Sequence, residues 1–403
     1  MKSTIIIVTH VVNDAVTHGF VPTAKAMGLE VILITDHRLS HLRLSENDPG
    51  FSPDEILECD VFNPLELIET ITGKGLKPSA IFSNSDHLQT STAICAQFFG
   101  VPAKDWKVTL KAKNKHLTRQ VLSEKRLPNV ASQLLYSGSV PAVDFPFPVV
   151  AKPKEGVASI DVQRCNSQNE LERYCEHFWQ KHPATPVLVE ALLQGPLMTV
   201  ETLGDGEKLT VVGGFDVELS EPPFFIETAA TFNGPNSSQF RNECIKQLQA
   251  FGIGFGACHS EFIITQSGPV LVEINYRSIG DGREFLLDNL SQGKWFSTIL
   301  NLHLGSELDT AFQLNGSAKV HYVVADQSGI IEGTSTSFLT REDDIVIQQQ
   351  VLKQVGENLA QSFSNKDYLA RISVVSPSGE NLEPTLQKTI SQFNLKAASE
   401  VAA

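Results

Sequence analysis

The chain has 403 residues, of which 41% are hydrophobic and 19% charged, and its formal net charge is −14. This length predicts two or three domains with buried cores, and the acidic balance argues against binding to nucleic acid or to an anionic membrane. The six cysteines are scattered without a C-x-x-C pair, so neither a zinc site nor a disulfide framework is indicated. No apolar run is long enough to span a membrane and no signal-peptide pattern opens the chain, so we expect a cytoplasmic protein.

The N-terminal part has the alternation of an α/β domain with a parallel sheet. Short apolar runs lie at residues 5–8, 31–34 and 80–82. They are separated by segments long enough for helices, as parallel strands buried on both faces require. The loop at 9–14 lacks G-x-G-x-x-G although Asp36 follows the second run, so a dinucleotide site is a weak alternative. We expect this domain to span residues 1–107.

A helix is predicted at residues 114–126, because its apolar residues recur on one face and Pro128 follows it. Lys115 lies at its start. On its own, such a lysine is usually a solvated helix residue.

The next predicted element is a strand at 147–153 that contains Lys152 near its end. A small-residue loop with Gly156 and Ser159 follows, and a second strand is predicted from Ile160. Such a loop brings backbone N–H groups close to phosphates, and Lys152 would add a positive charge. A plain hairpin turn is the alternative.

Two further elements complete this region. Helical spacing predicts one packed face made of Leu171, Tyr174, Cys175, Phe178 and Trp179. An apolar strand is predicted at 187–192, with Glu190 near its end. The alternative is that Glu190 has no role in binding and lies at the buried end of a strand.

The segment around residue 267 is predicted to form a β-hairpin with polar groups on one face. A three-residue connection at 266–268 places glycine where a left-handed residue is needed. A turn centred there sets Glu261 opposite Glu273 and His259 opposite Asn275. The residues predicted for the core face are Phe262, Ile264, Val270, Val272 and Ile274.

Opposed carboxylates in a sheet repel each other, by about 0.2–1 kcal/mol at an exposed position. We therefore expect a positive charge beside Glu261 and Glu273. Glu261, Glu273 and the amide oxygen of Asn275 form an all-oxygen set, which suits Mg²⁺ or Mn²⁺ rather than zinc. Arg277, two residues further on, could stabilise charge on a transferring phosphoryl group. The alternative is a solvated hairpin with scattered charges.

The run E-F-I-I-T-x-x-G-P-V-L-V-E-I-N-Y-R resembles the metal-binding signature of the ATP-grasp superfamily. In that signature two acidic residues and an asparagine hold Mg²⁺, and an arginine lies beside the γ-phosphate. By position, the resemblance implies Glu261, Glu273 and Asn275 as metal ligands and Arg277 as the catalytic residue.

The resemblance covers about residues 108–310. It implies an α/β chain with the ATP-grasp fold, built from an N-terminal α/β domain, a lid at about 145–195, a platform, and a small C-terminal domain at 311–403. The ATP-binding residues that it implies are Lys115, Lys152, Gly156, Ser159, Glu190, Ala191 and Leu192. Family members often carry a ribose-binding glutamate seven residues after Glu190, and here that position holds Leu197.

Substrate-binding residues are expected on both sides of the hairpin. P-P-F-F-I-E-T resembles a segment of carboxylate–amine ligases, which implies that Glu227 meets a substrate amine or orders the site. An edge-strand carboxylate explains it equally well. The loop after the hairpin contains Asp281 and Arg283 at a predicted helix start, which suits an anionic acyl substrate, with Arg283 as a carboxylate clamp.

From about residue 311 a smaller β-rich unit is predicted. Its strands are expected at 320–325, 329–333 and 370–375, around a helix near 347–363. No catalytic set is evident there, so packing or oligomer contacts are expected.

The resemblance implies an enzyme that uses ATP and Mg²⁺ (or Mn²⁺) to join a small-molecule carboxylate to an amine or amino acid. An acylphosphate would form, and ADP and phosphate would leave. The resemblance is closest to ligases that join amino acids or small acids, including those that make dipeptides, peptide antibiotics and siderophores, and a vibrioferrin-type siderophore ligase is one candidate. A carboxylase that uses bicarbonate and a non-catalytic nucleotide-binding module are the alternatives, and a homodimer is left open.

Overall fold

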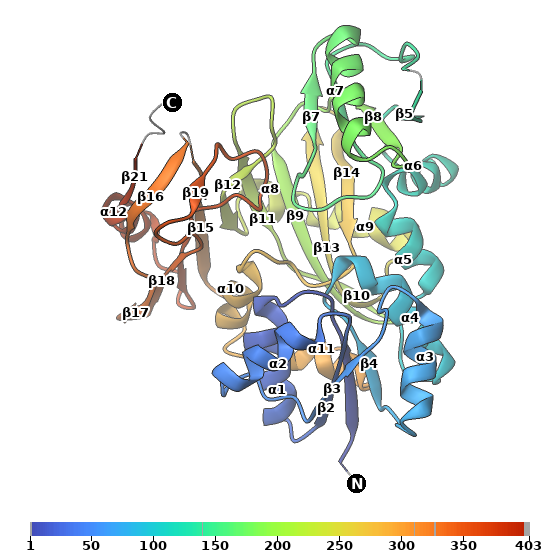
Figure 1. Cartoon of the computed structure of the whole chain (residues 1–403), viewed down its shortest axis with the longest axis vertical. Coiled ribbons are helices and arrows are strands. Elements are labelled where there is room, and N and C mark those ends of the chain that lie inside the picture. The colour runs from blue at the N-terminus through green and yellow to red at the C-terminus, as the bar shows by residue number, and fades with distance from the viewer. Residues whose placement is uncertain (1, 139, 310, 326–327, 399–403) are drawn as a thin grey trace.

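The protein is described here by a computed structural model, which places residues 2–138, 140–309, 311–325 and 328–398. In Figure 1 the N-terminal unit lies at the bottom, the long central sheet rises above it, and a small sheet with helix α7 lies at the top. The C-terminal strands form a wing at the left. Among the placed residues, no helix is both long and apolar enough to cross a membrane.

The N-terminal unit is a parallel sheet of four strands in the order β3-β2-β1-β4. Ile5 and Ile7 of β1 pack into one hydrophobic cluster, whereas Ile6 and Val8 pack into another, so both faces of the sheet are covered. The elements are β1 (Thr4–Val8), η1 (Ala15–Phe20), α1 (Val21–Ala26), β2 (Glu30–Thr35), α2 (Arg38–Asn47), β3 (Glu55–Glu58), α3 (Pro64–Gly73), β4 (Ala80–Phe82), η2 (Asp86–Leu88) and α4 (Gln89–Phe98). The direction of winding reverses between β1 and β4, where open α/β sheets bind ligands.

This unit packs tightly on the central part. The rings of Phe20 and Phe296 meet edge to face, with centroids 4.9 Å apart. Gly19 allows this approach, because a Cβ there would lie 2.4 Å from the Phe296 ring. The loops after β1 and β4 are thereby fixed against the central sheet.

A ten-stranded sheet in the order β14-β13-β9-β11-β12-β15-β20-β18-β17, with β10 on β9, forms the centre of the molecule. Its first strands and the adjoining helices are β9 (Leu197–Asp205), β10 (Leu209–Gly213), β11 (Phe215–Leu219), β12 (Glu227–Phe232), α8 (Pro235–Gln239), α9 (Arg241–Phe251), β13 (Phe255–Thr265), β14 (Gly268–Asn275), α10 (Arg283–Leu290) and α11 (Trp295–His303). Cys244, Leu248 and Phe251 of α9 pack beneath Phe262 and Leu271 of the hairpin. The amphipathic helix therefore buries the hairpin's apolar face.

The small sheet at the top of Figure 1 has the order β5-β8-β6-β7. Its elements and the helices that lead into it are α5 (Trp106–Lys113), α6 (Lys115–Glu124), β5 (Ser132–Leu135), β6 (Val149–Pro153), β7 (Gln163–Cys165), α7 (Gln168–Lys181) and β8 (Val187–Ala191). The five apolar positions predicted for α7 are all buried. The strand predicted from Ile160 begins only at Gln163, because Ala158, Ser159 and Asp161 have positive φ angles that are incompatible with an extended strand.

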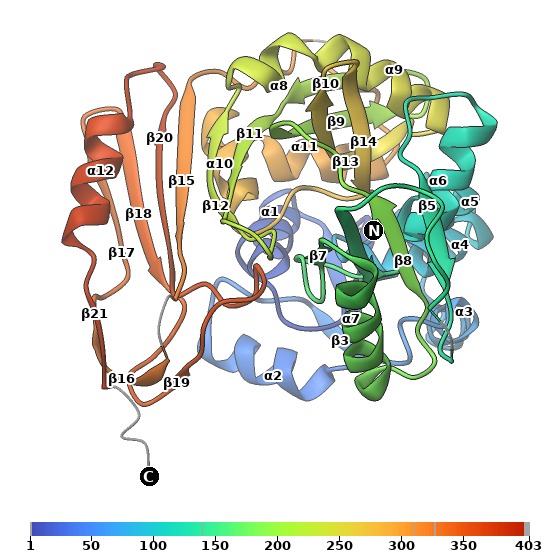
Figure 2. The same ribbon diagram turned by 90° about the horizontal axis from the view of Figure 1, so that it is seen from above.

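The C-terminal strands continue the central sheet, since β15 pairs with β12 at Ala230–Val320. Figure 2 shows β15, β20 and β18 side by side in this wing. The elements are β15 (Ser317–Val323), β16 (Gly329–Thr334), β17 (Phe338–Glu342), β18 (Ile345–Val351), β19 (Asn358–Leu359), β20 (Ala370–Ser376), α12 (Glu383–Gln392) and β21 (Leu395–Ala398). The domain boundaries at 107 and 310 stay predictions, and residue 310 lies outside the described part.

The helix predicted near 347–363 is wrong. Residues 345–351 form strand β18, which pairs with β20 from Val346 to Val351. Ile347 and Gln349 are buried while their neighbours are more exposed, which is the two-residue period of a strand. Tertiary pairing overrides the helix preference of the glutamine run.

Candidate active site

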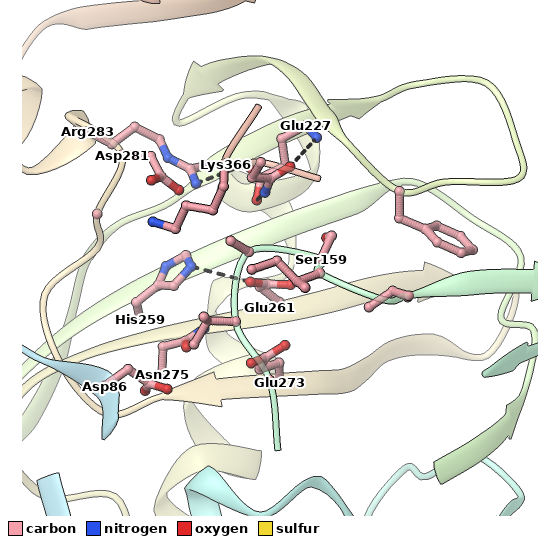
Figure 3. A pocket seen from close by; sticks show the side chains of 18 of the residues that line it. Asp86, Ser159, Glu227, His259, Glu261, Glu273, Asn275, Asp281, Arg283 and Lys366 are labelled. Atoms are coloured by element: carbon pink, nitrogen blue, oxygen red, sulfur yellow. Dashed lines mark hydrogen bonds and ion pairs between the residues drawn. The ribbon is translucent and has the colours of Figure 1, made fainter. Parts of the chain in front are cut away.

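A cavity of about 870 Å³ lies among the N-terminal loops, the small sheet, the hairpin and the C-terminal wing. Every residue predicted for the site lines this cavity: Lys115, Lys152, Gly156, Ser159, Glu190, Ala191, Leu192, Glu227, Glu261, Glu273, Asn275, Arg277, Asp281 and Arg283. Figure 3 shows the carboxylates of the hairpin on one side and the Glu227–Arg283 pair on the other. The structure thus brings together residues from positions 115 to 283, and their roles stay predictions.

The hairpin has the predicted register where the polar groups lie. Glu261 pairs with Glu273 and His259 with Asn275. The turn is shorter than predicted, because Thr265 already pairs with Gly268, and a bulge between Glu261 and Phe262 compensates.

The bulge changes the core face of the second strand. Leu271 is fully buried opposite Phe262, whereas Val272 lines the cavity. The prediction that Val272 belongs to the core is therefore wrong. One extra residue in a strand moves the following side chains to the other face, and the alternation of the sequence does not reveal it.

Lys115 connects the start of α6 to the hairpin. Its Nζ lies 3.0 Å from Glu273 Oε1 and donates to the Gly156 carbonyl oxygen at 3.2 Å. Asn114 caps the helix by accepting from the Leu117 N–H, which fixes the position of Lys115. Burial acts to lower the pKa of Lys115, but the Glu273 carboxylate outweighs burial and raises it. Lys115 is therefore a fixed cation in the cavity wall.

Glu190 is held by two cations. Arg119 Nε and Lys152 Nζ each lie 2.6 Å from one of its carboxylate oxygens. Burial acts to raise the pKa of Glu190, yet Arg119 and Lys152 outweigh it and lower the pKa to about 2. Arg119 also donates to the carbonyl oxygens of Leu271 and Val272, at 2.6 and 2.7 Å. This arginine, which the sequence did not single out, joins β8 to the hairpin.

The predicted adenine hinge is already hydrogen-bonded through its N–H groups. The Ala191 N–H donates to the Ala131 carbonyl oxygen, and the Leu192 N–H donates to that of Pro148. Leu193 follows and also lines the cavity. Leu197, which stands at the position of a ribose-binding glutamate, is buried in the wall at the start of β9.

A buried histidine lies behind the hairpin carboxylates. His259 Nδ1 is 2.7 Å from Glu201 Oε1, and its Nε2 is 3.6 Å from Glu261 Oε1. Burial acts to lower the pKa of His259, but Glu201 and Glu261 outweigh it and raise the pKa to about 9. The register had placed His259 beside the metal set without giving it a role, and Glu201 carried no signal in the sequence.

Arg277 follows the hairpin and lies near Asp86 from the loop after β4. Burial acts to raise the pKa of Asp86, but Lys113 and Arg277 outweigh it and lower the pKa. Arg277 Nη1 donates to the Ser278 carbonyl oxygen at 2.8 Å, which restrains its guanidinium. Asp86 was also missed, because nothing in its sequence neighbourhood connects it to residue 277.

The opposite wall is organised by a buried ion pair. Arg283 Nη2, at the start of α10, lies 2.8 Å from Glu227 Oε2 at the start of β12. The Glu227 N–H donates to Asn365 Oδ1 at 3.0 Å, and the Tyr368 hydroxyl donates to the Glu227 carbonyl oxygen at 2.9 Å. The C-terminal unit, expected to serve packing or oligomer contacts, therefore supplies part of the cavity wall.

The donors on the hairpin fit a hard divalent cation. Two carboxylates and an amide oxygen from Glu261, Glu273 and Asn275 converge on one wall of the cavity (Figure 3). The cationic Lys115 and His259 already lie beside these carboxylates, so the site favours positive charge. An oxygen-only set suits Mg²⁺ or Mn²⁺.

No family model matches the chain. The chain is 22% identical over 355 residues to the uncharacterized protein y4rH of Sinorhizobium fredii, covering 84% of this chain and 73% of the relative. It is 25% identical over 240 residues to carnosine synthase 1 of Gallus gallus, covering 53% of this chain and 26% of that protein.

Solved structures resemble nearly the whole chain. An L-amino acid ligase from Bacillus licheniformis matches with a TM-score of 0.78 and 16% identity over 99% of both chains. Phosphoribosylglycinamide synthetase from Anaerococcus prevotii matches with a TM-score of 0.71 and 14% identity, over 99% of this chain and 100% of that one. The chain has the ATP-grasp fold.

The biotin carboxylase domain of the Hydrogenobacter thermophilus 2-oxoglutarate carboxylase, solved with MgADP and bicarbonate, also matches. Its TM-score is 0.68 at 15% identity, over 98% of this chain and 91% of that one. The predicted ATP-grasp fold is confirmed. At these identities the likeness establishes the fold.

Proposed function

We propose that the protein is an ATP-dependent ligase that joins a small carboxylic acid to an amine through an acylphosphate. The observation that carries the proposal is the arrangement of one cavity. Lys115 lies 3.0 Å from Glu273 on the hairpin, Lys152 lies 2.6 Å from Glu190, and Arg283 and Glu227 form the facing wall. One cavity therefore contains cations that can bind phosphates, oxygen ligands for a metal, and a separate polar wall for substrates.

The chemistry requires activation of the acid, because hydroxide is a poor leaving group. A carboxylate oxygen attacks the γ-phosphorus, and the bond to the β–γ bridging oxygen breaks with its electron pair going to ADP. The amine then adds to the acyl carbon. The carbon–oxygen bond to phosphate breaks, the nitrogen loses a proton, and amide and phosphate are released.

Each part of the wall has one task in this scheme. Lys152, oriented by Glu190, and Lys115 bind phosphate oxygens, and the loop with Gly156 and Ser159 covers them. Glu261, Glu273 and Asn275 would hold Mg²⁺, which would neutralise charge on the phosphates. Arg277, restrained beside Asp86, faces the charge that develops on the transferring group. The wall of Glu227, Asp281 and Arg283 orients the substrates.

A carboxylase that uses bicarbonate as its acid is the second candidate, supported by the likeness to biotin carboxylase domains. A non-catalytic nucleotide-binding module is disfavoured, because such a module does not need the opposed Glu261 and Glu273. The likeness to an L-amino acid ligase favours a dipeptide-like amide over a siderophore precursor as the product.

The test is phosphate release by the purified protein across a matrix of carboxylates and amines, with the nucleotide product identified by chromatography. The proposal expects ADP and phosphate that require an organic acid together with an amine. AMP and pyrophosphate would exclude the acylphosphate route. Turnover with bicarbonate as the only acid would favour the carboxylase.

A further inference from the structure

Arg277 lies in the link between β14 and α10, and the N-terminal part of the chain binds the main chain on both sides of it. Lys104 Nζ donates to the carbonyl oxygen of Tyr276, the residue before Arg277. The N–H of Ser278, the residue after it, donates to Asn84 Oδ1 at 3.1 Å. Arg277 belongs to neither a strand nor a helix, so these two contacts restrain a main chain that no regular element holds.

Lys104 is costly to bury. It is 4% exposed, and both of its hydrogen-bond acceptors, the Tyr276 carbonyl oxygen and Gln89 Oε1 at 2.7 Å, are uncharged. Burial lowers the pKa of Lys104 from 10.5 to about 7. A buried charge without an anionic partner is destabilising, and an apolar side chain of similar size would serve packing better. The hydrogen bond to the link is therefore what distinguishes this lysine from a packing residue.

A single amide group connects the two contacts. Gln89 of α4 is 5% exposed, and while its Oε1 accepts from Lys104, its Nε2 donates to two carbonyl oxygens. These belong to Ser83 and Ser85, at 2.9 and 2.8 Å, and the two serines flank Asn84. Lys104 and Asn84 therefore belong to one hydrogen-bonded network, which contacts the link at two points.

The central part of the molecule holds the side chains of the same link. The Tyr276 hydroxyl accepts from the N–H groups of residues 254–255, both at 3.1 Å. Ser278 Oγ accepts from Trp295 Nε1 at 2.9 Å. The side chains of the link are thus fixed by one part of the molecule and its main chain by another.

Resting on the proposed ligase function, we propose that Lys104, Asn84 and Gln89 are positioning residues for Arg277. They hold its main chain where its guanidinium meets the transferring phosphoryl group. Exact placement matters, because a displacement of about 1 Å can lower a rate about 100-fold. The N-terminal part of the chain then contributes to the rate without touching the reacting atoms.

The experiment removes each contact with a side chain of similar size. Lys104→Met and Asn84→Leu should each lower kcat by about 10- to 100-fold. The dissociation constant for ATP, measured by calorimetry, should change far less. ADP release is followed with Mg²⁺, ATP, hydroxylamine and the acid of the matrix that gives the highest rate. Asn84 is partly exposed, so Asn84→Leu keeps the inference testable if Lys104→Met does not fold.

Asn84 lines the cavity, and a conservative variant separates positioning from contact with substrate. Asn84→Asp keeps the oxygen that accepts from the Ser278 N–H but loses the Nδ2 donor. It should restore most of the kcat that Asn84→Leu loses. If the two variants were equally slow, Asn84 would act through its Nδ2 donor, and its assignment as a positioning residue would be wrong.

A double-mutant cycle tests whether Lys104 acts through Arg277. In an Arg277→Ala background, Lys104→Met should lower kcat by no more than about twofold, since the group that it positions is absent. A purely structural role would lower kcat equally in both backgrounds and would overturn the inference. Hydrogen exchange measures the same contacts without substrate, and the Ser278 amide should exchange faster in Asn84→Leu than in the wild type.

Lys125→Met is the matched control. Lys125 Nζ also donates to a main-chain carbonyl oxygen, that of Ala250, but from an exposed position that does not line the cavity. Its loss should change neither kcat nor the exchange of the Ser278 amide.

Two outcomes distinguish this inference from the proposed function. If no acid supported turnover, or if Arg277→Ala were as fast as the wild type, the proposed function would fail and this inference with it. If Arg277→Ala were slow while Lys104→Met and Asn84→Leu both kept the wild-type kcat, only this inference would be overturned.

Discussion

Lys115 and Glu273 form an ion pair of 3.0 Å across the cavity wall, although 158 residues separate them in the chain. Both groups are held by their elements, since Lys115 opens a capped helix and Glu273 lies in a paired strand. The pair shows that the hairpin carboxylates attract positive charge in this cavity. It also places a lysine suited to phosphate directly beside the predicted metal ligands.

The first prediction concerns the metal. Glu273→Gln removes one negative ligand while keeping its shape, so turnover should fall by about 100-fold or more. The free energy of unfolding should also fall, because the substitution leaves the buried Lys115 without its partner at 3.0 Å. Steady-state kinetics with Mg²⁺ titration and urea unfolding measure the two effects. Glu207→Gln, at an exposed turn, is the control. Wild-type turnover that persists in EDTA would contradict the metal assignment.

The second prediction concerns nucleotide binding. Lys152→Ala should weaken ATP binding by about 1–3 kcal/mol, the usual loss for a charge-assisted hydrogen bond. Lys154→Ala, two residues away, is the control, because Lys154 pairs with Glu155 at 3.2 Å and does not line the cavity. Calorimetry with ATP measures both. If the two variants bound ATP with equal affinity, the phosphates would bind at a position away from Lys152.

The third prediction separates catalysis from binding. Arg277→Ala should lower kcat by about 100- to 1,000-fold, because its charge matches a group that becomes more negative only in the transition state. The dissociation constant for ATP should change far less. Single-turnover kinetics and nucleotide titration provide the comparison. A loss of affinity as large as the loss of rate would make Arg277 a binding residue.

The fourth prediction is a pH dependence of stability. Burial raises the pKa of Glu284 from 4.5 to about 7, with Arg371 only partly opposing it. The folded state therefore keeps a proton that the unfolded chain releases, so the contribution of this group is fully present below pH 4.5 and is lost as the pH rises through about 7.

The change in the free energy of unfolding caused by Glu284→Gln should thus be more stabilising at pH 8 than at pH 4.5, by about 3 kcal/mol. This follows because one pKa unit corresponds to about 1.4 kcal/mol. Urea unfolding at both pH values measures this difference. Glu380→Gln, which is exposed, should show none. An equal effect of Glu284→Gln at both pH values would mean that Glu284 is ionised in the fold throughout.

The sequence predicted the parts of the site that local patterns encode. Two-residue alternation placed Glu261 opposite Glu273, and apolar spacing followed by Pro128 placed Lys115 at a helix start. The bulge that turns Val272 toward the cavity could not be predicted, since several registers bury a comparable apolar face. The contacts of Arg119, Asp86 and Asn365 could not be predicted either, because each contact depends on where a distant element of the chain packs.

The central claim is that the acid is activated by phosphorylation, and the fate of its oxygen tests this most directly. With the carboxylate substrate labelled with ¹⁸O, an acylphosphate leaves one labelled oxygen in the released phosphate, because the carbon–oxygen bond breaks when the amine attacks. We predict ¹⁸O in inorganic phosphate, with ADP as the nucleotide product, in mass spectra of the complete reaction. Label found in AMP, or absent from the phosphate while amide forms, would contradict the account.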